Sequence, residues 1–258
     1  MKKTLFILFT ILVFIIIIFL SQDGSRFVGI NYKVEEKKLS NFKKISQFYE
    51  RHINYKELVN SITKHSNTKE ERVVDISKWV FKNIKKPTKN DNIIDNHPWT
   101  IVERGIGVDD QFSDLLSVLL IYSDIDSFFY NKIDHYWHPI TFFSIKKNEW
   151  SIIDPYYGVY FLNKKLKFSN LDQDKKEEFI PYHLELGIIN SNNFNKIFFD
   201  KDFKNILELD KYLKNILTKL PSNNKINSTH IYERGNGSRS YIQEPLHRLF
   251  YQFYKFAN

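Results

Sequence analysis

Ten residues near the middle of the chain, Arg104-Gly105-Ile106-Gly107-Val108-Asp109-Asp110-Gln111-Phe112-Ser113, decide how the sequence is interpreted. Two glycines and two acids precede an apolar segment that continues to Tyr122. Acidic residues favour the first turn of a helix, where they meet the positive end of the helix dipole. The pattern therefore predicts a glycine-rich loop that leads directly into a helix over residues 109–122.

The predicted helix is apolar on most of its circumference. Val118, Leu120 and Ile121 widen an already apolar inner face. A helix that is apolar on nearly all sides belongs in the core of a domain. The inner face is expected to consist of Phe112, Leu115, Leu116 and Leu119.

Other segments place this helix within a fold. An amphipathic helix is expected around residues 42–49 and a second one after the capping box Thr68-Lys69-Glu70-Glu71, ending at Lys86-Pro87. After the central helix, period-two patterns predict a set of antiparallel strands. Beyond residue 171 the pattern indicates helices and loops. This order predicts an α+β fold. The expected strands are residues 127–130, 137–145, 149–154 and 159–162, with a turn at 146–148.

Two polar residues stand out on the expected strands. His138 precedes Trp150-Ser151-Ile152-Ile153-Asp154-Pro155 by twelve residues, which is enough for a strand, a turn and the start of the next strand. Alternate residues of a strand share one face. A hairpin would therefore bring His138 and Asp154 together, within a hydrogen-bond distance of about 2.6–3.2 Å.

This set of residues resembles the transglutaminase-like superfamily. In that family a glycine-rich loop delivers a Cys at the start of a helix, and a His and an Asp follow on successive strands. The family pattern is roughly G-x-C-D-Q-F-A, and this chain has Gly107-Val108-Asp109-Asp110-Gln111-Phe112-Ser113. The resemblance covers residues 57–165. It implies a papain-like core in which a buried central helix packs against an antiparallel sheet.

The chain contains no Cys, so the nucleophile of that family is absent. Asp109 stands at the Cys position if Asp110-Gln111-Phe112 sets the register, and Val108 stands there if the glycines do. His138, Asp154 and Asp109 would then be a remnant triad. Two other interpretations of Asp109 remain open. It could cap the helix, or it could act with His138 and Asp154 as a base or carboxylate nucleophile.

A metal site is the other chemistry that the sequence suggests. Asp134-His135-Tyr136-Trp137-His138 holds two His and one Asp within five residues. Residues three apart on a strand point to opposite faces, so His135 and His138 would diverge. A structural zinc site without Cys would also need His and carboxylate ligands alone. We therefore predict no metal and no cofactor.

The first residues predict attachment to a membrane. Residues 4–20 carry no charge and suffice for a spanning helix, which needs about 17–25 residues. Lys2 and Lys3 favour a cytoplasmic N-terminus with the domain translocated. A cleaved signal peptide is the alternative, but Phe19-Leu20-Ser21-Gln22 offers no small-residue cleavage site. The net charge of +8 accompanies no nucleic-acid-binding module, so we expect no nucleic-acid partner.

The expected organisation has four parts: a signal anchor at 1–22, a polar tether at 23–40, a transglutaminase-like domain at 41–170, and a helical C-terminal extension at 171–258. The leading hypothesis is a single-pass membrane protein with an extracytoplasmic, non-catalytic pseudoenzyme domain. It would bind a peptide, a cell-envelope polymer or a partner protein. The first alternative is an active hydrolase or acyltransferase that uses Asp109, His138 and Asp154. The second is a structural partner in an envelope assembly, with no ligand in the cleft.

Overall fold

The computed structural model describes residues 2–30, 33–91, 97–133, 136–147, 149–171 and 179–190, together with Glu208, Lys211 and Leu217. The described chain divides into two compact units, with the division between Asn54 and Tyr55. Those three single residues, which fall within the predicted C-terminal extension, are helical. Most of the C-terminal extension therefore lies outside the described residues.

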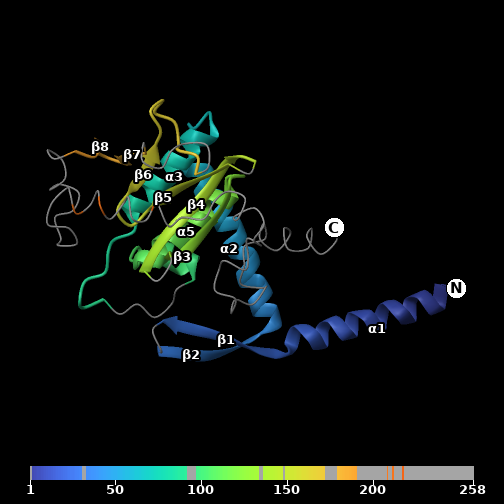
Figure 1. Cartoon of the computed structure of the whole chain (residues 1–258). Helices are drawn as coiled ribbons and strands as arrows, with labels where there is room; N and C mark the ends of the chain where they lie inside the picture. Colours follow the sequence, from blue (N-terminus) through green and yellow to red (C-terminus); the bar gives the residue numbers. More distant parts are fainter. Residues whose placement is uncertain are drawn as a thin grey trace. The chain divides into compact units, whose positions relative to one another are not determined.

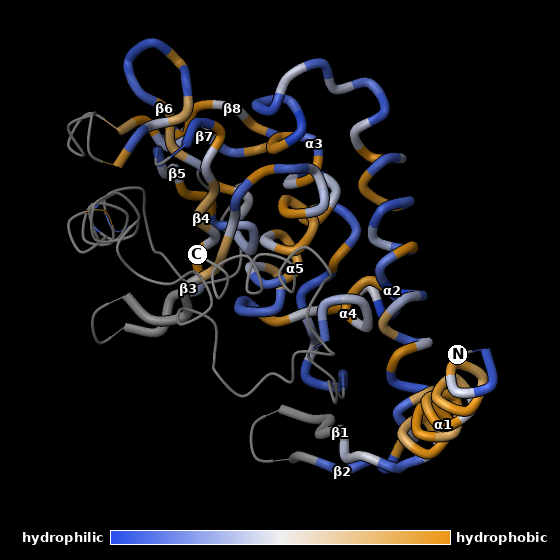
Figure 2. Tube along the Cα trace, turned by 90° about the vertical axis from the view of Figure 1, so that its right-hand side faces the viewer, coloured by the Kyte–Doolittle hydropathy of each residue, from blue (hydrophilic) through white to orange (hydrophobic). Residues whose placement is uncertain are grey.

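The first unit begins with the apolar helix α1 (Lys2–Ser21), which buries none of its residues within the protein. Figure 2 shows α1 as hydrophobic along nearly its whole length. It is long and apolar enough to cross a membrane, a property that a signal sequence shares. The predicted tether contains an antiparallel hairpin, β1 (Asp23–Ile30) and β2 (Lys33–Ser40). Helix α2 (Asn41–Ile62) follows and continues past the division between the units.

The second unit combines helices with one antiparallel sheet, which confirms the predicted α+β class (Figure 1). Its sheet has six strands in sequential order, each antiparallel to its neighbours. Its helices are α3 (Lys69–Asn83), α4 (Pro98–Arg104) and α5 (Asp109–Tyr122). Its strands are β3 (Asp126–Ile133), β4 (Tyr136–Lys146), β5 (Glu149–Asp154), β6 (Val159–Leu162), β7 (Ile180–His183) and β8 (Gly187–Ile188).

Helix α5 forms the centre of the core. It contacts α3 on one side and strands β3 and β4 on another. Residues 111–120 are all buried, which confirms the expectation that the helix belongs in the core. The four side chains of the predicted inner face are each at most 1% exposed: Phe112, Leu115, Leu116 and Leu119.

Helix α3 begins where its capping box predicts. The Thr68 hydroxyl accepts a hydrogen bond from the Glu71 N–H at 3.1 Å, and the Glu71 carboxylate accepts one from the Thr68 N–H at 3.2 Å. These bonds satisfy two backbone donors that would otherwise lack partners at the helix start. The helix is amphipathic as expected, and its apolar face is buried: Val73, Ile76, Val80 and, just past the end of the helix, Ile84.

The sheet contains the four expected strands, β3 to β6, and extends further than predicted. Strands β7 and β8 lie in residues 180–188, which we had assigned to a helical extension, and that assignment is wrong for this segment. Ile180-Pro181-Tyr182-His183 is too short to show a reliable period. Its strand conformation comes from pairing with β6, where Val159 lies opposite His183.

Helix α4 was also not predicted, although its sequence contains signals for both ends. Pro98 opens the helix, and the His97 side chain accepts a hydrogen bond from the Trp99 N–H at 3.2 Å. Gly105 ends it with a left-handed φ of 67°. Proline just inside the start and glycine just past the end are characteristic of helix termini.

A second glycine in a left-handed conformation controls the turn between β5 and β6. Gly158 has φ 68°, and a Cβ added to it would lie 2.9 Å from Cδ2 of Phe81. Gly105 has a similar φ, but the nearest atom to its added Cβ is the Asn83 carbonyl oxygen at 3.6 Å. The two positions therefore share the conformational constraint and differ in the space around them.

We predict that Gly158→Ala destabilises the protein more than Gly105→Ala. A left-handed conformation costs an L-residue about 1–2 kcal/mol at either position, and the contact with Phe81 adds to this cost only at Gly158. Urea unfolding of the two variants and the wild type measures both effects. Equal losses of unfolding free energy would show that Phe81 yields without cost.

Candidate functional site

The loop before α5 is held in place by backbone bonds to residue 85. The Lys85 N–H donates to the Gly105 carbonyl at 2.8 Å, and the Gly107 N–H donates to the Lys85 carbonyl at 3.0 Å. A Cβ on Gly107 would lie 3.3 Å from methyl groups of both Ile84 and Ile101. The close approach of these segments therefore favours glycine at position 107.

Gln111 fixes the start of α5, a role that sequence reasoning did not assign to it. Its side chain is 2% exposed, and Oε1 accepts hydrogen bonds from the Val108 N–H at 3.2 Å and from Nη2 of Arg104 at 3.1 Å. Arg104 Nε also donates to the Ile106 carbonyl at 2.8 Å. A Gln three residues after the N-cap is the usual partner in a capping box, so the signal for this role was present in the sequence.

Asp109 is the first residue of α5, and Val108 occupies the N-cap position. The Asp109 carboxylate accepts a hydrogen bond from the Asp110 N–H at 2.9 Å. Asp109 is therefore not the cap residue itself, but it does accept a first-turn N–H as the capping interpretation required. Its negative charge also meets the positive end of the helix dipole.

Asp154 ends β5 and organises the turn that follows. It is 5% exposed, and Oδ1 accepts hydrogen bonds from the N–H groups of Tyr156 at 3.0 Å and Tyr157 at 3.1 Å. An Asp side chain that bonds to the backbone two and three residues later stabilises a tight turn. This carboxylate thus has a structural function besides the one predicted for it.

His138 lies in β4, and its side chain is outside the described residues, as are Asp134 and His135. Strand β4 pairs with β5, with Thr141 opposite Ile153, so the strands that carry His138 and Asp154 are neighbours. The predicted hydrogen bond between the two side chains stays a prediction. Among the described residues, no group of three or more metal-ligating side chains occurs.

Side-chain contacts join the start of α5 to β4 and to the turn that follows β5. The Thr141 hydroxyl donates to the Ser113 carbonyl at 3.1 Å, which fixes β4 against the first turns of α5. Phe112 packs edge-on against Tyr156 in the Asp154 turn, with ring centroids 5.3 Å apart. Helix α5, which carries Asp109, therefore adjoins β4, which carries His138, and the turn that begins at Asp154.

Lys86 covers the aromatic side of the Asp154 turn. Its ammonium group lies 4.1 Å from the ring centroid of Tyr156 and 4.7 Å from that of Tyr157. A cation within about 6 Å of an aromatic face is attracted by the ring quadrupole. Lys86 follows directly on Lys85, so the same short segment contacts both the glycine loop and the Asp154 turn.

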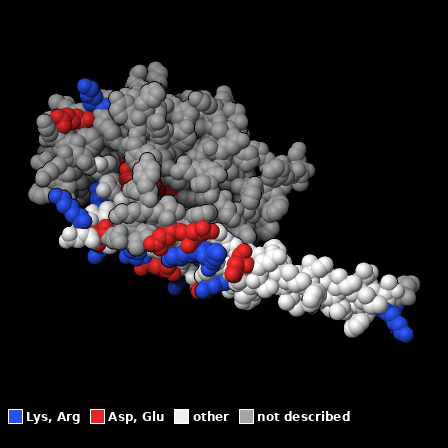
Figure 3. Space-filling model, turned by 90° about the horizontal axis from the view of Figure 1, so that it is seen from below, with Lys and Arg blue, Asp and Glu red and all other residues white. Residues whose placement is uncertain are grey.

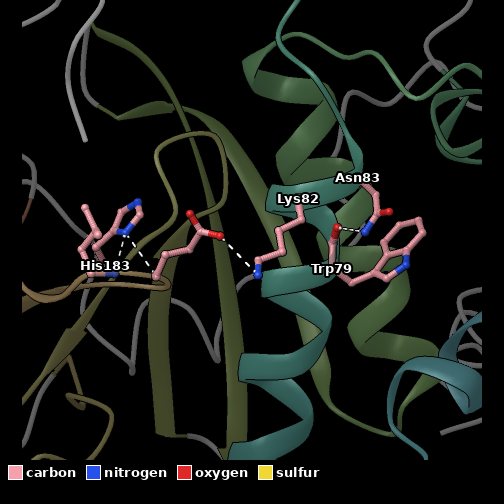
Figure 4. Close-up of polar contacts among 6 residues, drawn as sticks. Trp79, Lys82, Asn83 and His183 are labelled. Atoms are coloured by element: carbon pink, nitrogen blue, oxygen red, sulfur yellow. Dashed lines mark hydrogen bonds and ion pairs between the residues drawn. The ribbon is translucent and has the colours of Figure 1, made fainter. Parts of the chain in front are cut away.

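His183 supports the Asp154 turn from β7, and sequence reasoning missed it because it lies beyond the recognisable pattern. It is 3% exposed, and Nδ1 accepts hydrogen bonds from the N–H groups of Glu185 and Leu186, both at 3.2 Å. Figure 4 shows these bonds beside the ion pair between Lys82 and Glu185, which measures 3.3 Å.

The surroundings of His183 favour its neutral form. Burial lowers the pKa of His183, and this effect outweighs the opposing influence of Glu185 and of the Tyr157 backbone. Its ring packs edge-on against Phe81, with centroids 5.3 Å apart. The Leu184 N–H donates to the Gly158 carbonyl at 2.9 Å, so the histidine segment and the turn are directly bonded.

Comparisons with known proteins add little to this geometry. No protein-family model matches the chain, and no curated protein sequence matches it significantly. One similar solved structure, from Parabacteroides distasonis, is described as a "putative protease", with 12% sequence identity and a TM-score of 0.31. That similarity covers 66% of this chain and 40% of the other, so the chain spans less than half the length of that protein.

We predict that His183 makes the protein less stable at mildly acidic pH. Its folded-state pKa lies below the unfolded value of about 6.5, so the unfolded chain binds the proton more readily. Stability from this residue is complete above pH 6.5 and falls as the pH drops through that value toward the folded-state pKa. His183→Asn keeps an acceptor near the Nδ1 position and removes the titration.

Urea unfolding of wild type and His183→Asn between pH 7.5 and pH 5 tests this prediction. As the pH falls, the unfolding free energy of the wild type should decrease relative to that of the variant. Other histidines contribute equally to both proteins and cancel in the difference. A difference that is independent of pH would contradict the prediction.

Proposed function

We propose that this protein is a single-pass membrane protein whose extracytoplasmic domain has a transglutaminase-like core and acts by binding, without catalysis. The observation that carries the proposal is the pairing of a family-like arrangement with the absence of any Cys among 258 residues. The bound partner would be a peptide, a cell-envelope polymer or another protein.

The arrangement of three elements supports the transglutaminase-like core. A buried helix, α5, starts from a glycine loop and packs against antiparallel strands. Two adjacent strands, β4 and β5, carry His138 and Asp154. The contacts Thr141–Ser113 and Phe112–Tyr156 connect both strand regions to the helix start, where the family nucleophile would stand.

The chemistry of the helix start supports a non-catalytic role. A thiolate at this position would be both nucleophilic and stabilised by the helix dipole. Asp109 supplies a carboxylate that already accepts a backbone N–H bond. A carboxylate is a weaker nucleophile than a thiolate, and this one already bonds to the backbone of the helix start.

One observation favours the alternative of an active hydrolase or acyltransferase. Asp109 is only half-buried and starts the helix that adjoins the strand of His138 and the turn that begins at Asp154. Carboxylate nucleophiles occur in enzymes. In this alternative Asp109 would attack the substrate carbonyl to form an acyl anhydride, His138 would protonate the amine or alcohol that leaves, and water would then hydrolyse the anhydride. Alternatively, Asp109 would act as a base toward an attacking water, and the amine or alcohol would leave with a proton from His138.

The composition of α1 supports the membrane anchor. Its only charged residues are Lys2 and Lys3, and Figure 3 shows α1 free of charged side chains beyond its tip. Positive residues before a first span favour retention of the N-terminus in the cytoplasm. With that orientation, the domain after α1 would lie on the extracytoplasmic side.

We predict that the full-length protein in detergent micelles has no amidase, peptidase or transamidation activity, because it has no thiolate to attack an acyl group. Chromogenic amide substrates and amine-incorporation assays measure these activities. Turnover that Asp109→Ala abolishes would favour the carboxylate-based hydrolase and reject the non-catalytic function.

We also predict that Asp109→Cys creates a reactive thiol if the site descends from a cysteine hydrolase. The helix start and His138 would lower the thiol pKa below its usual value of about 8.5. Alkylation by iodoacetamide should be much faster at pH 7 than at pH 5, and His138→Ala should slow it. Because the chain has no native Cys, each variant carries a single thiol.

Two further variants complete this experiment. Lys165→Cys places a thiol at an exposed position outside the site and gives the reactivity of an ordinary thiol. Val108→Cys tests the other register, since Val108 directly precedes α5. If both site thiols react like the Lys165→Cys thiol regardless of His138, the proposed remnant site is rejected.

A further inference from the structure

Helix α2 has an exposed apolar stripe on its N-terminal half. Its four members are separated by three or four residues, which places them on one face of the helix. At 100° per residue they span an arc of about 80°. The stripe consists of Phe42 (63% exposed), Ile45 (42%), Tyr49 (60%) and Ile53 (38%).

The stripe begins where the apolar helix α1 ends. Asn41, the first residue of α2, donates its backbone N–H to the Gln22 carbonyl at 2.9 Å. The Asn41 side-chain amide donates to the Phe19 carbonyl, also at 2.9 Å. These two bonds attach the start of α2 to the last turn of α1, although eighteen residues separate Gln22 from Asn41.

The β1–β2 hairpin contacts a different side of α2. The Lys44 ammonium group donates to the Ser25 carbonyl at 3.0 Å. Lys44 lies two helical positions from Phe42 and five from Tyr49, at roughly 140–200° around the helix from these two residues. The hairpin therefore leaves the apolar stripe uncovered, in agreement with the exposure of its side chains.

Within this unit, residues 41–54 of α2 run across the direction of α1. Figure 1 shows α1 from the side, and Figure 2 shows it nearly along its axis while α2 is seen from the side. A spanning helix stands near the membrane normal, with an average tilt of about 20°. A helix that crosses it at its end lies along the membrane surface.

The charge of this region suits an anionic lipid surface. Residues 33–54 contain six basic side chains and three acidic ones. Lys37, Lys38 and Lys43 are exposed, and Figure 3 shows charged side chains gathered next to the uncharged α1. Basic residues around an apolar helix face, with a Tyr among its members, are characteristic of helices that bind at the membrane interface.

We infer that the N-terminal half of α2 lies on the leaflet from which α1 emerges, with the apolar stripe in the boundary between headgroups and acyl chains and its basic neighbours on anionic headgroups. The inference rests on the proposed membrane anchoring by α1 and adds a second, surface-bound attachment. This second attachment would hold residues 41–54 at the bilayer surface, where a free tether would not.

Single-Cys variants of the full-length protein test this inference, because the chain has no native Cys. Phe42→Cys and Tyr49→Cys report on the stripe, and Lys43→Cys and Glu50→Cys are matched neighbours on another face. Val13→Cys reports on α1. Each variant is labelled with the fluorophore NBD and reconstituted into vesicles of phosphatidylcholine with phosphatidylglycerol, with and without nitroxide-labelled lipids.

We expect lipid nitroxides at the top of the acyl chains to quench the labels at 42 and 49 at least twofold more than those at 43 and 50, which lie on another face of the helix. Nitroxides deep in the acyl chains should quench the label at 13. Omitting phosphatidylglycerol should weaken the quenching at 42 and 49 and leave that at 13 unchanged.

Three results would overturn the inference. If the label at 13 is quenched and those at 42 and 49 behave like 43 and 50, α1 is an anchor and α2 does not lie on the membrane. If the labels at 42 and 49 are shielded from aqueous iodide but not quenched by lipid nitroxides, protein covers the stripe. If the label at 13 is not quenched, the proposed membrane anchoring by α1 is rejected, and the inference about α2 is rejected with it.

Discussion

The burial of α5 is the constraint on which the second unit depends. Ten consecutive residues, 111–120, are buried between α3 and the sheet. Fully burying one Leu or Phe side chain contributes about 1.5–3 kcal/mol, so this one helix provides a large share of the apolar burial. Strands β3 and β4 and helix α3 each bury an apolar face against it, and their positions follow from its position.

A helix buried on all sides must also satisfy its polar groups without water. The Gln111 side chain bonds to the loop before the helix, and the Ser117 hydroxyl donates to the Asp114 carbonyl at 2.8 Å. The Thr141 hydroxyl from β4 donates to the Ser113 carbonyl. These bonds reduce the cost of burying polar groups, and they fix the loop and the neighbouring strand relative to the helix start.

The candidate site is built on these same structural contacts. Asp154 stabilises the turn that follows it, and His183 in β7 packs beside that turn. Asp109 accepts a hydrogen bond in the first turn of α5. Each group holds backbone in place, so each would keep this conformation with or without catalysis. In the proposed transglutaminase-like core, these backbone bonds would hold the geometry of the site without a thiol, as the proposed binding function requires.

The sequence by itself determined the elements with strong local patterns. The capping box of Thr68 and Glu71 fixed the start of α3, continuous apolar character predicted burial of α5, and period-two alternation located β3 to β6. Local patterns suffice there because hydrogen bonds and side-chain periodicity act within a few residues. The resemblance to the transglutaminase-like superfamily, not spacing alone, singled out Asp109 and Asp154, and their roles in a site stay predictions. The first residues showed a helix long and apolar enough for a membrane.

Only the tertiary structure decided the features that depend on distant partners. Strand β7 forms because β6 offers an edge, and β8 then pairs with β7; segments of four and two residues cannot show this from their own pattern. The lowered pKa of His183 results from burial by Phe81 and the Gly158 turn, which are far away in the sequence. The bonds from Asn41 to Phe19 and Gln22 arise because the intervening hairpin returns the chain to the end of α1. Contacts across such separations depend on how whole elements pack, and no local pattern encodes them.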